Sequence, residues 1–190
     1  MEHTRDNPSL MSQPEHKVQA TSEPVDLNRY LGRWFEIERF NSWFEWSTST
    51  DNTAEYTMHH DTIRVINRCR SPSRWMPTEA HGVAVVGPEH DTSKLKVSFS
   101  VFSPAADYWI LAVGPLTAEF DLYPWAVVGT PDRRYAWILS RTTHMDEQDL
   151  RRAKRCLQDQ GFDVGKLVHV EHTVAGGTEE SLLNAHSFNQ

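Results

Sequence analysis

The chain has 190 residues and a mass of 21.9 kDa, which is the size of one domain with tails or of two small domains, and we expect a single core. Its 26 acidic residues outnumber 19 basic ones, and the net charge of −7 excludes the electrostatic attraction to phosphate backbones on which nucleic-acid binding depends. Two cysteines, Cys69 and Cys156, are too few to hold a small secreted scaffold together and lack the close spacing of a zinc site.

Both ends of the sequence are polar and show no apolar period. Residues 1–25 and 171–190 are therefore predicted to be a disordered N-terminal tail and a flexible C-terminal tail. The first residues have neither the basic and apolar pattern of a signal peptide nor a lipid-accepting cysteine, and no stretch approaches the roughly 20 apolar residues of a spanning helix. We expect a cytoplasmic or peripheral membrane protein, or a bacterial outer-membrane protein if a leader is missing from this sequence.

Short apolar or alternating runs, separated by turn residues, follow one another between the tails. They predict eight strands, at residues 33–42, 53–58, 62–69, 78–86, 93–101, 107–113, 122–128 and 134–141. Their even spacing and short connections favour an all-β antiparallel meander. A sheet of eight such strands closes most readily into an up-and-down barrel, whose interior holds one small ligand.

Residues 146–160 break the strand pattern. Apolar residues recur there at helical spacing, acidic residues crowd the start, and Gly161 stands where a C-terminal cap is expected. This segment is predicted to be a helix, followed by a ninth short strand at residues 166–170.

The two-residue period of a strand assigns side chains to faces. In the first strand one face holds Trp34, Glu36, Glu38 and Phe40, and the other holds Phe35 and Ile37. In the last strand one face holds Tyr135, Trp137, Leu139 and Arg141, and the other holds Ala136, Ile138 and Ser140. A half-apolar helix needs an apolar surface to pack on, which Phe35, Ile37, Ala136 and Ile138 would provide outside the barrel. The opposite faces then point inward.

Three motifs now occur in a recognisable order. Gly32-Arg33-Trp34 is followed by Phe-Glu-Ile, then Tyr108-Trp-Ile-Leu, then Tyr135-Ala-Trp-Ile-Leu-Ser-Arg141 running into a helix that ends in Gly-Phe-Asp-Val-Gly-Lys. Over residues 26–170 this order resembles the lipocalins. Within that family it is most similar to the branch of the bacterial outer-membrane lipocalins, the plant temperature-induced lipocalins and apolipoprotein D.

The resemblance implies an eight-stranded barrel, closed at one end and open at the other, that binds a hydrophobic molecule. It also implies structural roles for Gly32, Trp34 and Arg141, because in the family this tryptophan packs beneath the last-strand arginine at the closed end. A guanidinium over an indole ring contributes about 0.5–2 kcal/mol. We expect this pair to hold the fold rather than to contact ligand.

Aromatic residues further from the closed end are the candidates for ligand contact. They are Phe40, Tyr56, Phe99, Tyr108, Trp109, Trp125 and Trp137. Simple core packing is the alternative for each, because alternation alone does not say which face of the middle strands points inward. An apolar tube would hold a long-chain fatty acid or a lysophospholipid, at about 0.8 kcal/mol per buried methylene. The expected role is carriage or storage of that lipid, in membrane maintenance or stress response.

Two local features depart from the family pattern. Trp43, Phe44 and Trp46 place three large rings in the loop after the first strand, where they form a lid, dip into a membrane interface or pack on the barrel rim. Pro124 falls in a predicted strand, and since proline removes a ladder donor we expect a bulge or a strand start there, with Trp125 reoriented.

Other classes of function have less support in the residues. Cys69 lies between two arginines that would lower its pKa, so a lipocalin-type enzyme remains an alternative, although we expect no enzyme and no Cys69–Cys156 bridge. The paired His59 and His60, and His169 with His172, do not have the spacing of a closed metal site, and we expect no metal and no cofactor. A protein that interacts through its exterior, with a filled cavity, is the remaining alternative.

Overall fold

The computed structural model describes residues 17–41, 48–71, 76–100, 104–116 and 121–173. Its strands are β1 (Gly32–Phe40), β2 (Thr50–His59), β3 (Thr62–Arg70), β4 (Thr78–Val86), β5 (Lys94–Ser98), β6 (Ala106–Val113), β7 (Trp125–Gly129), β8 (Ala136–Ser140) and β9 (Leu167–His169). Its helices are α1 (Leu27–Tyr30), α2 (Glu147–Asp159) and the 3-10 turn η1 (Val164–Lys166). Within these residues no helix is both long enough and apolar enough to cross a bilayer.

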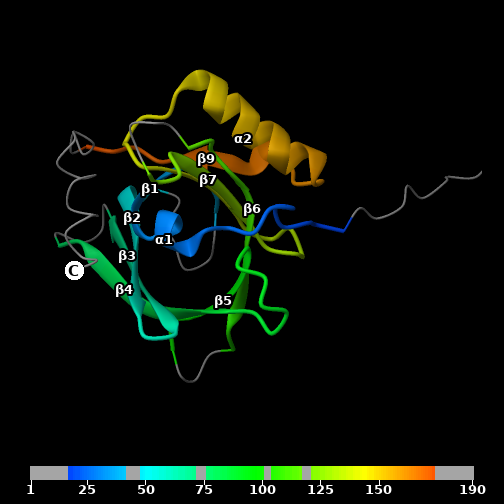
Figure 1. Ribbon diagram of the computed structural model, residues 1–190. Helices are drawn as coiled ribbons and strands as arrows, with labels where there is room; N and C mark the ends of the chain where they lie inside the picture. Colours follow the sequence, from blue (N-terminus) through cyan, green and yellow to red (C-terminus); the bar gives the residue numbers. More distant parts are fainter. Residues whose placement is uncertain (1–16, 42–47, 72–75, 101–103, 117–120, 174–190) are drawn as a thin grey trace, which may run out of the picture.

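The sheet closes on itself through β1. Strands β1 to β8 pair antiparallel in chain order, and β1 pairs with β8 on one edge and with β2 on the other. β2 uses only the first half of β1, residues 32–35, so β9 adds to the second half, residues 38–40. The eight-stranded all-β barrel with an outer helix and a short ninth strand is therefore confirmed. Figure 1 looks into the ring of strands and shows α1 across its opening.

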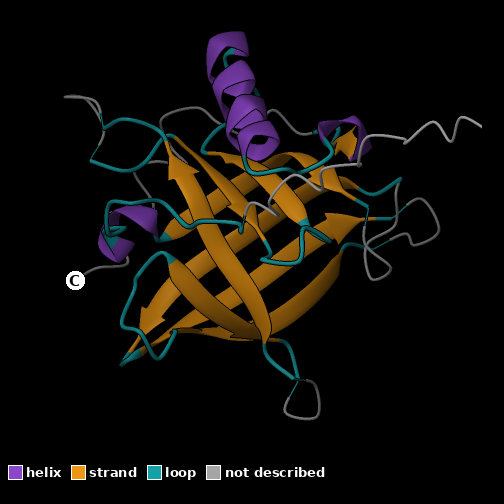
Figure 2. Cartoon of the chain, turned by 90° about the vertical axis from the view of Figure 1, so that its right-hand side faces the viewer, coloured by secondary structure: helices purple, strands orange, loops and turns teal. Residues whose placement is uncertain are grey.

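α2 packs against the outside of this ring (Figure 2). Asp146 caps its first turn by accepting a hydrogen bond from Gln148 N at 2.8 Å, and Gly161, with a φ of 78°, turns the chain back after its last residue. Ala153 and Leu157 are fully buried on the barrel wall. Phe35, Ile37, Ala136 and Ile138 lie in the same outer cluster, as the face assignment predicts.

A β-bulge in β1 reverses the faces of its second half. Phe35 and Glu36 lie opposite Ser140 and Leu139, but the register with β8 then shifts between Glu36 and Glu38, so one extra residue is inserted. Beyond the shift, Arg39 lies opposite the inward Trp137, and Glu38 and Phe40 face outward. The prediction that Glu38 and Phe40 point into the barrel is therefore wrong.

Contacts of the outward residues agree with this reversal. Glu38 Oε1 lies 2.7 Å from Lys154 Nζ of α2, and the Phe40 ring lies 6.2 Å from the Phe162 ring just after that helix. A bulge depends on the pairing of two strands. Strict alternation along one strand therefore does not reveal it.

The folded part of the chain extends beyond the predicted limits at both ends. Val18 and Val25 are buried, and Thr21 N donates to Ile110 O at 2.9 Å, so residues 17–25 pack on the barrel. At the other end Asp51 N donates to Glu171 O at 2.8 Å, and Asp51 also accepts from Thr173 N at 2.7 Å. Residues 17–25 and 171–173, predicted to be parts of the tails, are thus ordered against the strands.

Candidate functional site

The interior of the barrel near α1 is closed by a buried arginine. The guanidinium of Arg141 lies 3.6 Å from the centre of the Trp34 ring and donates to the carbonyl oxygens of Arg29, Tyr30, Arg33 and Tyr123, at 2.7–3.1 Å. Trp34 Nε1 in turn donates to Tyr30 O at 2.8 Å. Burial lowers the pKa of Arg141 to about 9. One cation thus joins α1, β1 and the approach to β7 at this end.

Three tyrosine hydroxyls meet above this closed end. Tyr108 Oη lies 2.7 Å from Tyr30 Oη and accepts a hydrogen bond from Tyr56 Oη at 2.9 Å. Burial raises the pKa of Tyr30, Tyr56 and Tyr108 alike, so all three are neutral near pH 7. The cluster gives the floor of the interior a small polar centre without charge.

The wall around this centre is apolar. All eight barrel strands contribute aliphatic or aromatic side chains to one interior cluster, among them Ala54, Ile63, Val65, Ala84, Leu95, Val97, Ile110, Val128 and Leu139. Such a surface offers an apolar ligand dispersion contacts and removal from water.

The half of the barrel farther from α1, called the distal half below, carries a polar cluster on its inner side. Arg39 Nε lies 3.4 Å from Glu36 Oε2, and Arg39 Nη2 donates to Ser49 Oγ at 3.0 Å. Asn52 Nδ2 donates to the same Glu36 oxygen at 3.3 Å. These residues are 4% (Glu36), 1% (Arg39), 4% (Ser49) and 2% (Asn52) exposed. Two amide oxygens nearby, Asn52 Oδ1 and Asn67 Oδ1, are buried with no hydrogen-bond partner among the described residues.

Three of the seven predicted ligand residues face the interior. Tyr56, Tyr108 and Trp137 belong to or pack against the interior cluster, and the Tyr108 and Trp137 rings stack at 6.5 Å. Phe99 follows the last residue of β5 and is 45% exposed. Gly82 leaves room for its ring, because a Cβ at that position would lie 2.8 Å from Phe99 Cδ1.

The remaining three predicted ligand residues lie on the outside of the barrel. Phe40, Trp109 and Trp125 all belong to or pack against the outer cluster beneath α2, so the prediction that they line the interior is wrong. The bulge in β1 turns Phe40 outward. For Trp109 and Trp125 the pairing of β6 and β7 decides the side, with Ile110, Ala126 and Val128 taking the inward positions. β7 begins at Trp125, which confirms a strand start next to Pro124.

Several interior residues were not predicted as site residues. Arg39 was concealed by the bulge, and Asn52 lies at a second register irregularity, between Thr50 and Thr53 of β2, just outside the predicted strand 53–58. The position of Tyr30, two residues before Gly32, is the sequence feature that could have identified it as an interior residue. Trp43, Phe44 and Trp46 lie outside the described residues, and their role stays a prediction.

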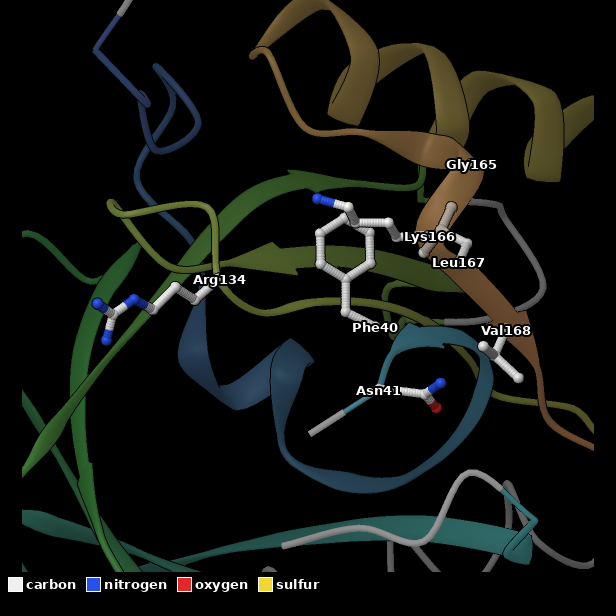
Figure 3. Close-up of a pocket in the computed structure, with 7 residues that line it drawn as sticks. All are labelled: Phe40, Asn41, Arg134, Gly165, Lys166, Leu167 and Val168. Atoms are coloured by element: carbon white, nitrogen blue, oxygen red, sulfur yellow. The ribbon is translucent and has the colours of Figure 1, made fainter. Parts of the chain in front are cut away.

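An open surface pocket of about 390 Å³ lies on the outer side of the barrel, where β1 ends beside η1 and β9. Figure 3 shows the Phe40 ring at its centre, with Lys166 beside it and the Arg134 side chain extending away. Its lining residues are Phe40, Asn41, Arg134, Gly165, Lys166, Leu167 and Val168. This pocket is separate from the interior.

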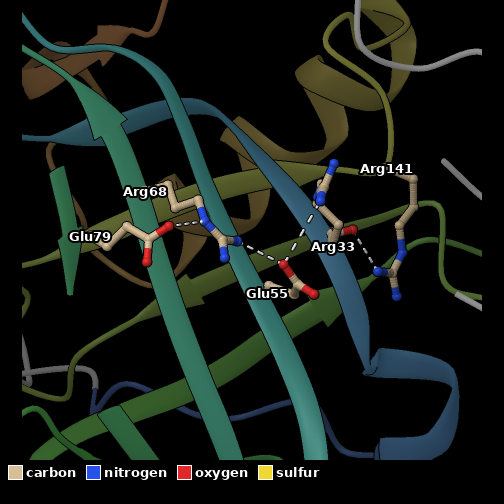
Figure 4. Close-up of polar contacts among 5 residues, drawn as sticks. All are labelled: Arg33, Glu55, Arg68, Glu79 and Arg141. Carbon is tan, nitrogen blue, oxygen red and sulfur yellow. Dashed lines mark hydrogen bonds and ion pairs between the residues drawn. The ribbon is translucent and has the colours of Figure 1, made fainter. Parts of the chain in front are cut away.

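The surroundings of the thiols give no support to a reactive cysteine. Arg68 donates to Glu55 Oε2 and Glu79 Oε1, both at 2.7 Å, across the outer surface of β2, β3 and β4 (Figure 4). Arg70 Nε lies 3.5 Å from Asp51 Oδ2. The arginines beside Cys69 are therefore engaged with carboxylates, and burial raises the pKa of the Cys156 thiol to about 11.

The histidines do not assemble a ligand set in the described part of the chain. There, no group of three or more His, Cys, Asp or Glu side chains is placed to hold a metal ion. His172 Nε2 instead lies 2.9 Å from the carbonyl oxygen of Glu36, and its ring packs edge-on against Phe35.

Comparisons with known proteins agree with this architecture. The family model described as a lipocalin-like domain matches residues 25–172. The chain is 36% identical to temperature-induced lipocalin-1 of Arabidopsis thaliana, over 80% of this chain and 82% of that protein. It is 38% identical to the outer membrane lipoprotein Blc of Citrobacter freundii, over 77% and 78%, and 31% identical to apolipoprotein D of Macaca fascicularis, over 77% and 79%.

Solved structures share the fold at lower identity. Lobster apocrustacyanin A1 superposes with a TM-score of 0.60 at 16% identity, over 88% of this chain and 95% of that chain. Insecticyanin from the tobacco hornworm Manduca sexta superposes with a TM-score of 0.61 at 18% identity, over 86% of each chain.

Proposed function

The chain belongs to the lipocalin family, whose members generally bind small hydrophobic ligands, and we propose that it binds one long-chain fatty acid or lysophospholipid noncovalently inside its barrel. The observation that carries this proposal is the interior wall, to which every barrel strand contributes apolar side chains. Each methylene buried there contributes about 0.8 kcal/mol. A chain of ten or so methylenes thus reaches the roughly 8 kcal/mol of a micromolar complex.

The proposed role is carriage or storage of the lipid, without catalysis. Relatives described as a temperature-induced lipocalin and as an outer membrane lipoprotein support a link to stress and to membrane maintenance. We propose that the protein is cytoplasmic or lies at a membrane surface, and the aromatic sequence of the loop that contains Trp43, Phe44 and Trp46 supports the membrane contact. Replacing all three by Ser should leave the free energy of unfolding unchanged and weaken binding to liposomes, and unchanged liposome binding would contradict membrane contact.

Native mass spectrometry of the purified protein tests the main proposal. We expect a co-purified lipid, or saturable one-to-one quenching of tryptophan fluorescence by oleate and by lysophosphatidic acid. Ala84→Trp fills the interior from β4, whereas Val83→Trp adds the same ring to the outer face of the same strand, where Val83 is 47% exposed. Folded Ala84→Trp should lose binding and Val83→Trp should keep it. No bound mass and no saturable response would favour interaction through the exterior instead.

A further inference from the structure

We propose that the cluster of Glu36, Arg39 and Asn52 inside the distal half of the barrel receives the head group of the ligand. It selects a head group that is neutral or zwitterionic and carries a hydroxyl or an ammonium donor. This inference rests on the proposed function and names the polar end of the lipid that the interior takes.

The amide of Asn52 has a defined orientation and an unused acceptor. A carboxylate only accepts hydrogen bonds, so the Asn52 nitrogen is the atom that faces Glu36 Oε2, at 3.3 Å. The amide oxygen then points elsewhere, and no described residue donates to it although Asn52 is only 2% exposed. A buried acceptor without a donor costs stability, so the site favours a partner that brings one.

The cluster faces the interior of the barrel, where the proposed ligand would bind. Glu36 lies opposite Leu139 and Arg39 lies opposite Trp137 across the β1–β8 ladder, and both partners belong to the interior side. Ala54, two residues from Asn52, and its cross-strand partner Asn67 continue the same inner surface on β2 and β3. The second amide oxygen without a donor, Asn67 Oδ1, is therefore on this surface as well.

The charges of the cluster indicate which head group fits. Glu36 and Arg39 form an ion pair at 3.4 Å, and this pair by itself carries no net charge. A fatty-acid carboxylate would add a negative charge next to Glu36 in a site of low dielectric, where repulsion is poorly screened. A hydroxyl group instead donates to the amide oxygen and adds no charge. An ammonium group donates as well, and the phosphate of the same zwitterionic head group balances its positive charge.

Four probes with the same oleoyl chain separate these head groups in the full-length protein. 1-Monooleoylglycerol offers hydroxyl donors, oleoyl lysophosphatidylethanolamine offers an ammonium donor, methyl oleate offers no donor, and oleate offers a carboxylate. We expect at least one of the two donor-bearing probes to bind about fivefold more tightly than methyl oleate and oleate do. Such a gain in affinity is typical of one buried hydrogen bond. A preference for one of the two donor probes identifies its donor as the one used.

Asn52→Ala tests the amide directly, and Asn41→Ala is its matched control. Asn41 is an exposed amide at the end of β1 that lines the outer pocket. Asn52→Ala should weaken the preferred donor probe about fivefold and leave methyl oleate unchanged, whereas Asn41→Ala should change neither. This pattern distinguishes a ligand contact from a purely structural cluster, whose loss would lower stability without altering the ranking of the probes.

The wild-type ranking keeps the test decisive if Asn52→Ala fails to fold. Equal affinities for all four probes, or a preference for oleate, would overturn the head-group assignment while leaving the proposed function in place. A folded Asn52→Ala with unchanged ranking would overturn it too. Failure of every probe to bind would overturn the proposed function itself, and the assignment with it.

Discussion

Removal of the Arg141 side chain should destabilise the barrel strongly while sparing the ligand site. Arg141 donates to four backbone carbonyls and lies 3.6 Å from the Trp34 ring. At about 1 kcal/mol per hydrogen bond and about 1 kcal/mol for the ring contact, the gross loss in Arg141→Met is about 5 kcal/mol. Removing the buried positive charge recovers part of this free energy, because burial of the charge is itself unfavourable and lowers the pKa of Arg141 to about 9.

The net expectation is a loss of about 3 kcal/mol in the free energy of unfolding. Urea denaturation followed by tryptophan fluorescence measures this loss. Arg134→Met is the matched control, because the Arg134 side chain is 77% exposed and should contribute less than about 1 kcal/mol. Folded Arg141→Met should bind oleoyl lipids like the wild type. A loss below about 1 kcal/mol would refute the structural role assigned to the pair, and a selective loss of lipid affinity would place Arg141 in the ligand site.

Three further perturbations follow from the same structure. Tyr108→Phe removes the hydroxyl shared by two buried tyrosines and should cost about 2 kcal/mol in urea denaturation. Burial raises the pKa of these tyrosines, so their contribution to stability is complete below pH 10 and is lost as the pH rises further. The free energy of unfolding of the wild type should therefore fall above pH 10, and Tyr108→Phe should make that fall less steep. An equally steep fall in both proteins would contradict this role of the tyrosines. Gly129→Ala places a Cβ 2.6 Å from Phe162 Cζ and should lower the thermal midpoint by the equivalent of about 1–3 kcal/mol; an unchanged midpoint would mean that the Phe162 side chain moves aside without cost. Lys154→Met leaves the carboxylate of Glu38 without its 2.7 Å partner and should cost about 1 kcal/mol, restored by adding Glu38→Gln; no recovery in the double variant would contradict the pairing.

The candidate site was only partly predictable from the sequence. Tyr56, Tyr108 and Trp137 face the interior as predicted. Phe40, however, lies beyond the bulge in β1 and faces outward, and Arg39 takes the inward position instead. Both errors have one cause, because a bulge is defined by the register between two strands and changes every face that follows it.

Local patterns determined the elements and the family of this protein. The spacing of apolar residues and turns predicts the eight strands, and helical periodicity with a capping glycine predicts α2. The motifs around Trp34 and Arg141 identify the lipocalins, because each is a short contiguous run of residues. These features depend on neighbours in the chain, which the sequence displays directly.

Only the tertiary structure decided what the interior contains. The three tyrosine hydroxyls that converge come from α1, β2 and β6, and the polar cluster of Glu36, Arg39 and Asn52 joins β1 to the start of β2. The sides taken by Trp109 and Trp125 follow from the pairing of β6 with β7 and from the packing of α2 on the outer wall. Strand register and closure of the barrel set these contacts, and both are properties of the whole sheet rather than of any one segment.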